Sequence, residues 1–260
     1  MTKKRIATLA TCLTLVGAVA VGGTLALISS QSKQLTNTFT VGDGYTEGDK
    51  DTADFLLQEN GVTQQGNGDY TNNETVVYGV NDGAVGVPYE NVVANSDLAK
   101  NPWFTLKDQT IGEQDNGKTP PNSWIVAKVD NIAAFEAAGL DITAVAQNTK
   151  WKLVTATKDA EGTWSYKLDT DSLVDTDFKS DGENTKYYFV YTEQLVASDG
   201  EKQNTQPLFT MLHAGEINEE SLNTNIVVKG VAVQAATSES TLNDQATLDD
   251  VMAAASDKLG

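Results

Sequence analysis

The chain has 260 residues, enough for one or two domains with a sizeable hydrophobic core. With 40% hydrophobic residues and a formal net charge of −18, its composition is that of a globular protein and disfavours binding to the phosphate backbone of nucleic acids. The single cysteine, Cys12, and the single arginine, Arg5, lie near the start, which excludes a disulfide framework and an arginine clamp from the remainder.

Residues 1–26 have the layout of a signal peptide. Residues 3–5 are basic, residues 6–32 carry no charge, and small side chains at Thr24 and Ala26 suit the −3 and −1 positions of a signal peptidase site. We expect cleavage between Ala26 and Leu27, which leaves 15 basic and 36 acidic residues, a net charge of −21, in a secreted protein without a membrane segment. The alternative is an uncleaved membrane helix, because the uncharged run is long enough to span a bilayer.

Residues 35–41 alternate strictly along the chain, which is typical of a β-strand. Leu35, Phe39 and Val41 share one face with Asn37, and Gly42 ends the strand. Residues 46–75 are polar and rich in glycine and asparagine, so they predict loops around a short apolar piece at residues 55–57.

Strands are next predicted at residues 75–80, 102–107 and 123–129, with a turn-rich loop at residues 109–122. A short helix should follow, capped by Asp130 or Asn131 and stopped by Gly139. Residues 150–155 and 162–168 favour a hairpin, and residues 186–191, 208–212 and 225–234 predict further strands. About nine short strands and little helix predict an all-β fold, an antiparallel jelly-roll-like sandwich in one domain.

The last segment of the chain predicts a helix. Thr247 and Asp250 fit a capping box with Asp in place of Glu, and one helical face collects apolar side chains: Leu248, Val251, Met252, Ala255 and Leu259. This helix could dock on the sandwich, stay partly disordered or contact another subunit. The predicted organisation is a signal peptide (1–26), an N-terminal strand (27–44), a sandwich domain (45–235) and a helical tail (236–260).

Several of these segments together resemble the TasA and camelysin family. The front KKRIATLATCLTLVGAVAVGGTLA, followed by NTFTVG at residues 37–42, is similar to exported proteins processed by the signal peptidase SipW. Further segments occur in the same order as in that family: WKLV at 151–154, YYFVY at 187–191, TQPLF at 205–209, IVV at 226–228 and VAVQA at 231–235. Residues 46–95 have no counterpart there, and Leu25 and Leu27 replace an aromatic residue expected at the cut site.

The resemblance implies a jelly-roll subunit outside a Gram-positive cell, often part of a biofilm matrix fibre. In the TasA branch it implies donor-strand exchange, in which the N-terminal strand of one molecule completes a sheet of the next. Such head-to-tail contacts between copies give an open filament. Leu35, Phe39 and Val41 would fill a groove in the neighbour. The same strand could instead be the first strand of its own sandwich, which leaves a monomeric surface binding module or adhesin as the alternative.

The camelysin branch implies a second alternative, a zinc peptidase. Zinc sites take three or four His, Cys or carboxylate ligands, whereas the chain after Ala26 holds only His213 among the first two types. Neither H-E-x-x-H nor G-x-S-x-G occurs, so we expect no enzyme and no catalytic residues.

Calcium is the one cofactor that the sequence leaves open. Acidic residues crowd one loop-rich stretch that includes Asp175, Asp177, Asp181 and Glu183, and calcium prefers such hard oxygen ligands. Their spacing does not follow the EF-hand pattern, so the alternative is a solvated acidic loop.

Overall fold

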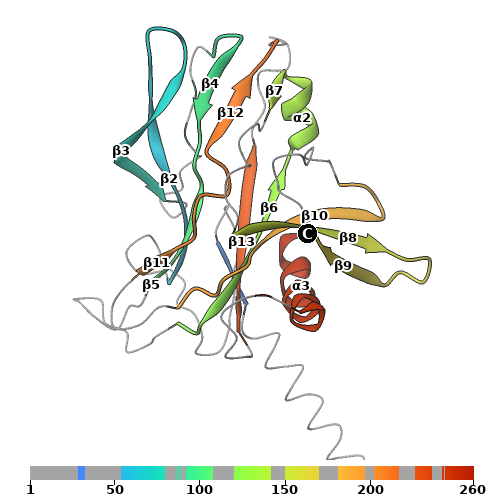
Figure 1. Ribbon diagram of the computed structural model, residues 1–260. Coiled ribbons are helices and arrows are strands. Elements are labelled where there is room, and N and C mark those ends of the chain that lie inside the picture. The colour runs from blue at the N-terminus through green and yellow to red at the C-terminus, as the bar shows by residue number, and fades with distance from the viewer. Residues whose placement is uncertain are drawn as a thin grey trace, which may run out of the picture.

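The computed structural model describes residues 29–32, 54–79, 87, 89, 92–107, 120–141, 150–169, 181–196, 202–216, 226–235, 242 and 244–260. These residues form two packed β-sheets with one long helix against the outer face of the first sheet (Figure 1). The predicted all-β sandwich with short helices and a C-terminal helix is confirmed.

The first sheet, called sheet A, has six strands whose neighbours all run antiparallel. Their spatial order is β1 (Ser29–Ser32), β13 (Val227–Gln234), β6 (Ser123–Asp130), β10 (Thr185–Tyr191), β8 (Trp151–Lys158) and β9 (Trp164–Leu168). The predicted hairpin is confirmed as β8 and β9. Strand β1 is the edge beside β13.

The second sheet, called sheet B, has seven strands. Their order is β11 (Lys202–Asn204), β5 (Trp103–Lys107), β2 (Phe55–Gln64), β3 (Tyr70–Gly79), β4 (Ser96–Ala99), β12 (Met211–Ala214) and β7 (Leu140–Asp141). Strands β3 and β4 pair in parallel, with Tyr70 opposite Leu98, so sheet B is mixed rather than purely antiparallel.

Aromatic side chains fill the core between the two sheets. The Phe104 ring from sheet B stacks on Phe55 at a centroid distance of 5.6 Å and lies 5.9 Å from the Trp151 ring of sheet A. Trp151 also meets Tyr191 edge-on at 5.1 Å, and its indole N–H donates to the backbone oxygen of Gln206 over 2.9 Å. The buried indole is therefore both packed and hydrogen-bonded.

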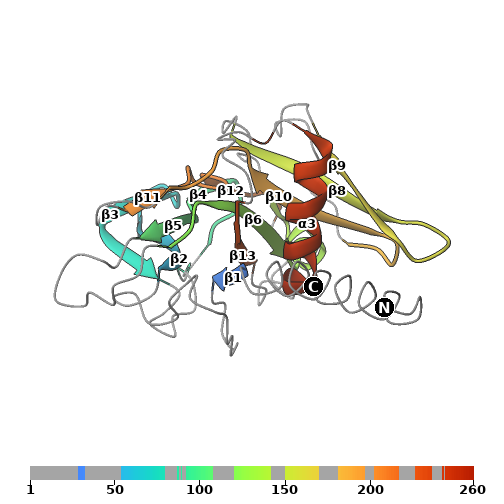
Figure 2. The same cartoon turned by 90° about the horizontal axis from the view of Figure 1, so that it is seen from below.

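A second core lies between sheet A and helix α3 (Gln245–Leu259), which crosses the face away from sheet B (Figure 2). Strand β6 is buried on both faces, because Trp124 and Val126 face the helix while Ile125 and Ala127 face sheet B. This explains the continuous apolar run at residues 124–127. The five residues predicted for the buried face of the tail helix are all buried: Leu248, Val251, Met252, Ala255 and Leu259.

Helix α3 starts before the predicted capping box. Its N-cap is Asp244, whose carboxylate accepts from the Thr247 N–H over 2.8 Å and from the Thr247 hydroxyl over 2.7 Å. Hydrogen bonds from Thr247 hold the pKa of the Asp244 carboxyl below its usual value. Thr247 is therefore the third helical residue, and the capping role predicted for it was wrong because the helix already begins at Gln245 and is capped by Asp244. The other helix, α2 (Ile132–Ala137), lies where a short helix was predicted.

The loop prediction was wrong over residues 58–64 and 70–74, which belong to strands β2 and β3. One cause is a buried ion pair, which allows charged residues to lie inside sheet B, where strand prediction relies on apolar ones. Glu59 in β2 meets the Lys100 ammonium at 2.6 Å and accepts from the Val87 N–H over 2.8 Å. Tertiary contacts thus supply partners that local sequence cannot reveal.

Another strand begins later than predicted. Leu208 and Phe209 were placed in a strand, but β12 starts at Met211, and these two side chains fill the inter-sheet core from an irregular segment. Within the described residues, no helix is long and apolar enough to cross a membrane.

Candidate assembly edge

The residues predicted to carry assembly lie just outside the part of the chain that the structure describes. This holds for the cleavage position at Ala26 and Leu27 and for the groove-filling residues Leu35, Phe39 and Val41. Strand β1 lies between these two sets in the sequence and is described. The sheet edge that β1 occupies is therefore the candidate site.

Strand β1 runs antiparallel along β13. Ser29 pairs with Val233 and Ser32 with Gly230, so β1 covers four of the eight residues of β13. It also lies against β2 of sheet B and against α3. Figure 2 shows β1 at the opposite end of sheet A from the β8–β9 hairpin. The N-terminal side of this chain therefore runs along a sheet edge of the same chain.

Strand β13 is a regular strand that is buried on both faces. It pairs with β6 in one unbroken register from Val227 opposite Asp130 to Gln234 opposite Ser123. Val231 and Val233 pack toward α3, whereas Val228 and Ala232 pack toward sheet B. A strand added at this edge would continue both cores.

Gly230 lets sheet B approach β13 closely. A Cβ atom at Gly230 would lie 2.0 Å from Cε1 of the Phe104 ring, which is far inside van der Waals contact. No side chain can be added there unless that fully buried ring moves. A glycine inside a predicted strand is a sequence signal for such a close approach.

A second long strand, β3, forms a hairpin with β2 and is less regular than β13. Its register with β2 shifts, so that Asn60 opposes Val77 while Gly61 opposes Asn73, and residues 74–76 form a bulge. The Asn73 side chain turns back and accepts from the Thr75 N–H over 3.2 Å. Bulges and turned-back side chains are devices that protect sheet edges from pairing.

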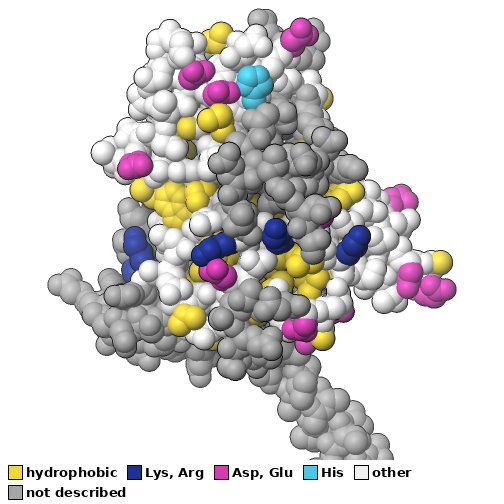
Figure 3. Space-filling model, in the orientation of Figure 1, with side chains coloured by type: hydrophobic (Ala, Val, Ile, Leu, Met, Phe, Trp, Pro, Cys, Tyr) yellow, Lys and Arg dark blue, Asp and Glu magenta, His cyan; other side chains and the backbone are white. Residues whose placement is uncertain are grey.

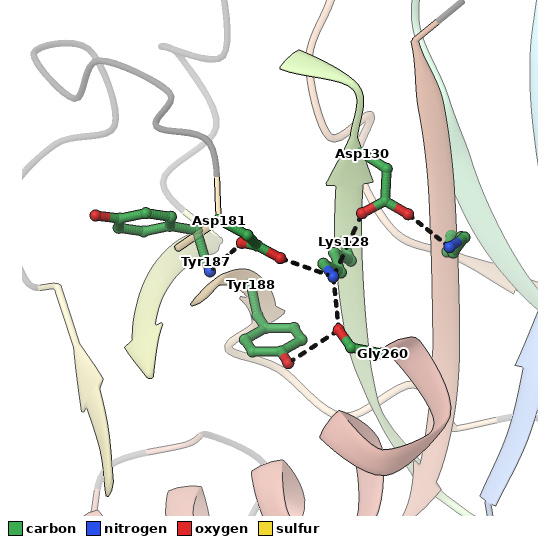
Figure 4. A network of polar contacts seen from close by, with 7 residues as sticks. Lys128, Asp130, Asp181, Tyr187, Tyr188 and Gly260 are labelled. Atoms are coloured by element: carbon green, nitrogen blue, oxygen red, sulfur yellow. Dashed lines mark hydrogen bonds and ion pairs between the residues drawn. The ribbon is translucent and has the colours of Figure 1, made fainter. Parts of the chain in front are cut away.

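A buried lysine fastens α3 to sheet A next to β13. The Lys128 ammonium lies 2.9 Å from Asp181, 3.4 Å from Asp130 and 2.6 Å from the backbone oxygen of Gly260 at the end of α3 (Figure 4). Asp130 in turn pairs with Lys229 of β13 at 2.5 Å. A cation at a helix C-terminus is favourable, because the last carbonyls lack partners within the helix.

Tyr188 completes the surroundings of Lys128. Its ring centroid lies 5.8 Å from the ammonium, and its hydroxyl donates to the Gly260 oxygen over 3.5 Å. Burial, with a contribution from the Asp181 charge, raises the pKa of the Tyr188 phenol, so this group stays neutral. The network has the features of a structural clamp. Its signal in the sequence is a lysine directly after the apolar run at residues 124–127.

The four possible calcium ligands divide into two groups. Asp175 and Asp177 lie outside the described residues. Asp181 pairs with Lys128 and also accepts from the Tyr187 N–H over 3.1 Å, whereas Glu183 is exposed. The described ranges contain no group of three or more His, Cys, Asp or Glu residues arranged to hold a metal ion. Calcium binding stays a prediction.

His213 lies on the surface in strand β12. Its Nδ1 atom is 2.8 Å from the Asp97 carboxylate, and its side chain is 37% exposed. Figure 3 shows the histidine in cyan beside acidic side chains, with basic side chains in a row across the middle of the same face. One carboxylate partner on an open surface is an ordinary cross-strand pair, since His213 and Asp97 face each other in register.

Comparisons with protein-family models, with curated proteins and with solved structures find no match for this chain. The function must therefore be argued from the sequence features and from the geometry of the β13 edge.

Proposed function

We propose that this chain is a secreted structural subunit that polymerises into extracellular fibres of a biofilm matrix. Residues 35–41 of one copy would add a strand to the sandwich of the next copy, in the manner of the TasA-type family. The observation that carries the proposal is the antiparallel pairing of β1 with β13. It brings the N-terminal side of the chain to a regular sheet edge, and residues 35–41 follow β1 after only two residues.

Apolar side chains would supply most of the energy of such a contact. Burying Leu35, Phe39 and Val41 would contribute about 1.5–3 kcal/mol each, whereas a backbone hydrogen bond contributes about 0.5–1.5 kcal/mol net. The acceptor would be the β13 edge, because the two cores of the sandwich meet there. The contact is head-to-tail, so it repeats into an open filament.

The local charge supports contacts between copies of an acidic protein. The whole chain has a net charge of −18, but residues 34–42 carry no charge. In β13 the only charged residue is Lys229, which pairs with Asp130. Two copies can therefore meet through these segments without placing like charges against each other.

Export would precede assembly. We propose that a SipW-type signal peptidase cleaves between Ala26 and Leu27 and releases a soluble subunit outside a Gram-positive cell. Expression of the full-length sequence in such a host tests this step. Protein recovered from the medium should have Leu27 as its first residue by mass spectrometry. Protein that stays on the cells and still carries residues 1–26 would contradict the proposed cleavage.

Electron microscopy of the secreted protein tests assembly. Wild type should form filaments, and Phe39→Asp should prevent them without changing thermal unfolding of the monomer, because a buried carboxylate opposes strand insertion. Thr38→Asp is the matched control, since alternation places Thr38 on the opposite face of the predicted strand. Wild type that stays monomeric at high concentration would favour the binding-module alternative. Unfolding of the Phe39→Asp monomer would instead assign residues 35–41 to their own sandwich.

A further inference from the structure

We propose that β1 occupies the acceptor edge of its own chain before assembly and must leave β13 for a neighbour to bind. This inference rests on the proposed function, because it names the step that controls fibre growth. The occupant that replaces β1 is the segment 35–41 of a second copy. Each subunit would thus begin as a self-covered monomer.

The lengths of the segments make the two states exclusive. Strand β13 has eight residues, and β1 already covers Gly230 to Val233. A strand made by residues 35–41 needs seven positions, so it cannot pair along β13 while β1 remains there.

The register also prevents the chain from placing its own apolar strand on β13. If the register of β1 continued, Leu35 would come opposite Val227, the first residue of β13. Phe39 and Val41 would then lie past the end of the strand. A strand from a second copy need not keep the register of β1, so it can bring all three apolar side chains onto this edge.

Strand β1 is built for weak pairing. Its sequence is SSQS, which has no apolar side chain to bury, and its pairing with β13 spans only four residues. The same register would also place Lys33 opposite Lys229, and like charges across a strand pair are destabilising. An apolar donor strand from a neighbour is therefore able to replace it.

Release of β1 would have two effects at once. It would open the β13 edge, and it would free the donor segment that begins three residues after Ser32. Assembly should therefore start slowly and accelerate once open ends exist. Preformed fibre fragments should remove the delay, because their ends already present an open edge.

A reversible covalent lock tests the proposal directly. Ser29 and Val233 are register partners, and neighbouring Cα atoms in an antiparallel pair lie within the range that a disulfide can bridge. The variant S29C/V233C should form this disulfide in the secreted protein, because the wild-type chain has no cysteine after Cys12. Oxidised protein should assemble at least ~10-fold more slowly than the same sample after reduction. The single variants S29C and V233C are the controls.

The outcomes separate this inference from the proposed function. Equal assembly of the oxidised and reduced samples would overturn the β1 proposal and leave fibre formation intact. If the two thiols of S29C/V233C stay free under oxidising conditions, the β1 proposal is also overturned, because β1 and β13 would not be paired. If neither wild type nor the reduced variant assembles, the proposed function fails. A deletion of residues 29–32 is the second variant, and it should assemble without a delay.

Discussion

Two strands of this sandwich, β13 and β3, each have one side that a neighbouring strand pairs with over only part of its length, and they differ in regularity. Strand β13 is regular along its eight residues, is buried on both faces and is paired with β1 over four of those residues. Strand β3 has ten residues, most of them exposed, and a bulge interrupts its pairing with β2. The exposed apolar side chains Val76 and Val77 lie on β3, not on β13.

The comparison teaches that regular geometry, more than exposed apolar surface, marks an edge that can accept a strand. A regular edge offers evenly spaced backbone groups, so it is a template for another chain. The bulge of β3 breaks that spacing, and Val76 packs over Gly61 within it, where a Cβ would lie 2.9 Å from the Val76 Cβ. We therefore expect β13 to be sensitive to substitution and β3 to be tolerant.

The largest effect should come from Gly230→Ala in β13. The new methyl group would overlap the Phe104 ring, and we expect the free energy of unfolding to fall by about 3 kcal/mol in urea titrations. Gly66→Ala in the turn between β2 and β3 is the matched control. Nothing lies within 4 Å of a Cβ there, so its effect should stay within about 0.5 kcal/mol. Similar losses of unfolding free energy for Gly230→Ala and Gly66→Ala would show that β13 is no more sensitive to substitution than the β2–β3 region.

A smaller effect is expected from Lys128→Met, which removes the contact that holds the end of α3 against sheet A beside β13. The change leaves Asp130 and Asp181 without their shared cation, but both side chains are partly exposed to water. We expect a loss of about 2 kcal/mol in unfolding free energy, together with faster amide hydrogen exchange in the last turn of α3.

Lys150→Met is the control for the lysine clamp. Lys150 pairs with Glu193 at 2.7 Å, but the side chains are 37% and 47% exposed, and such surface pairs add little stability. Its hydrogen bond to Glu193 raises the pKa of Lys150, a shift that has little weight at an exposed site. A loss of stability equal to that of Lys128→Met would show that the buried Lys128 network stabilises the fold no more than an exposed ion pair does.

The smallest effect should come from Val77→Lys in β3. The Val77 side chain is 47% exposed and its strand is bulged, so both thermal unfolding and filament formation should match wild type. Electron microscopy of Val77→Lys and Phe39→Asp under the same conditions compares their filament formation directly. Loss of filaments in Val77→Lys with an unchanged melting temperature would show that the assembly edge is β3 rather than β13.

Much of the sandwich could be predicted because its strands carry strong local signals. The buried run in β6, the hairpin of β8 and β9 and the apolar face of α3 all follow from periodicity. Strand β2 escaped prediction because Glu59 is buried only by virtue of Lys100, which lies 41 residues away in the sequence. Strand β1 escaped because SSQS has no apolar pattern.

The amino-acid sequence by itself determined the class of the fold, the face that α3 buries and the presence of an uncharged N-terminal region. These features depend on short-range patterns of apolar and polar residues, which act the same way wherever the segment lies. Only the tertiary structure decided that β1 lies along β13, that Gly230 faces Phe104 and that Lys128 holds the end of α3. Those contacts join residues far apart in the chain, so their partners emerge only when the two sheets and the helix pack together.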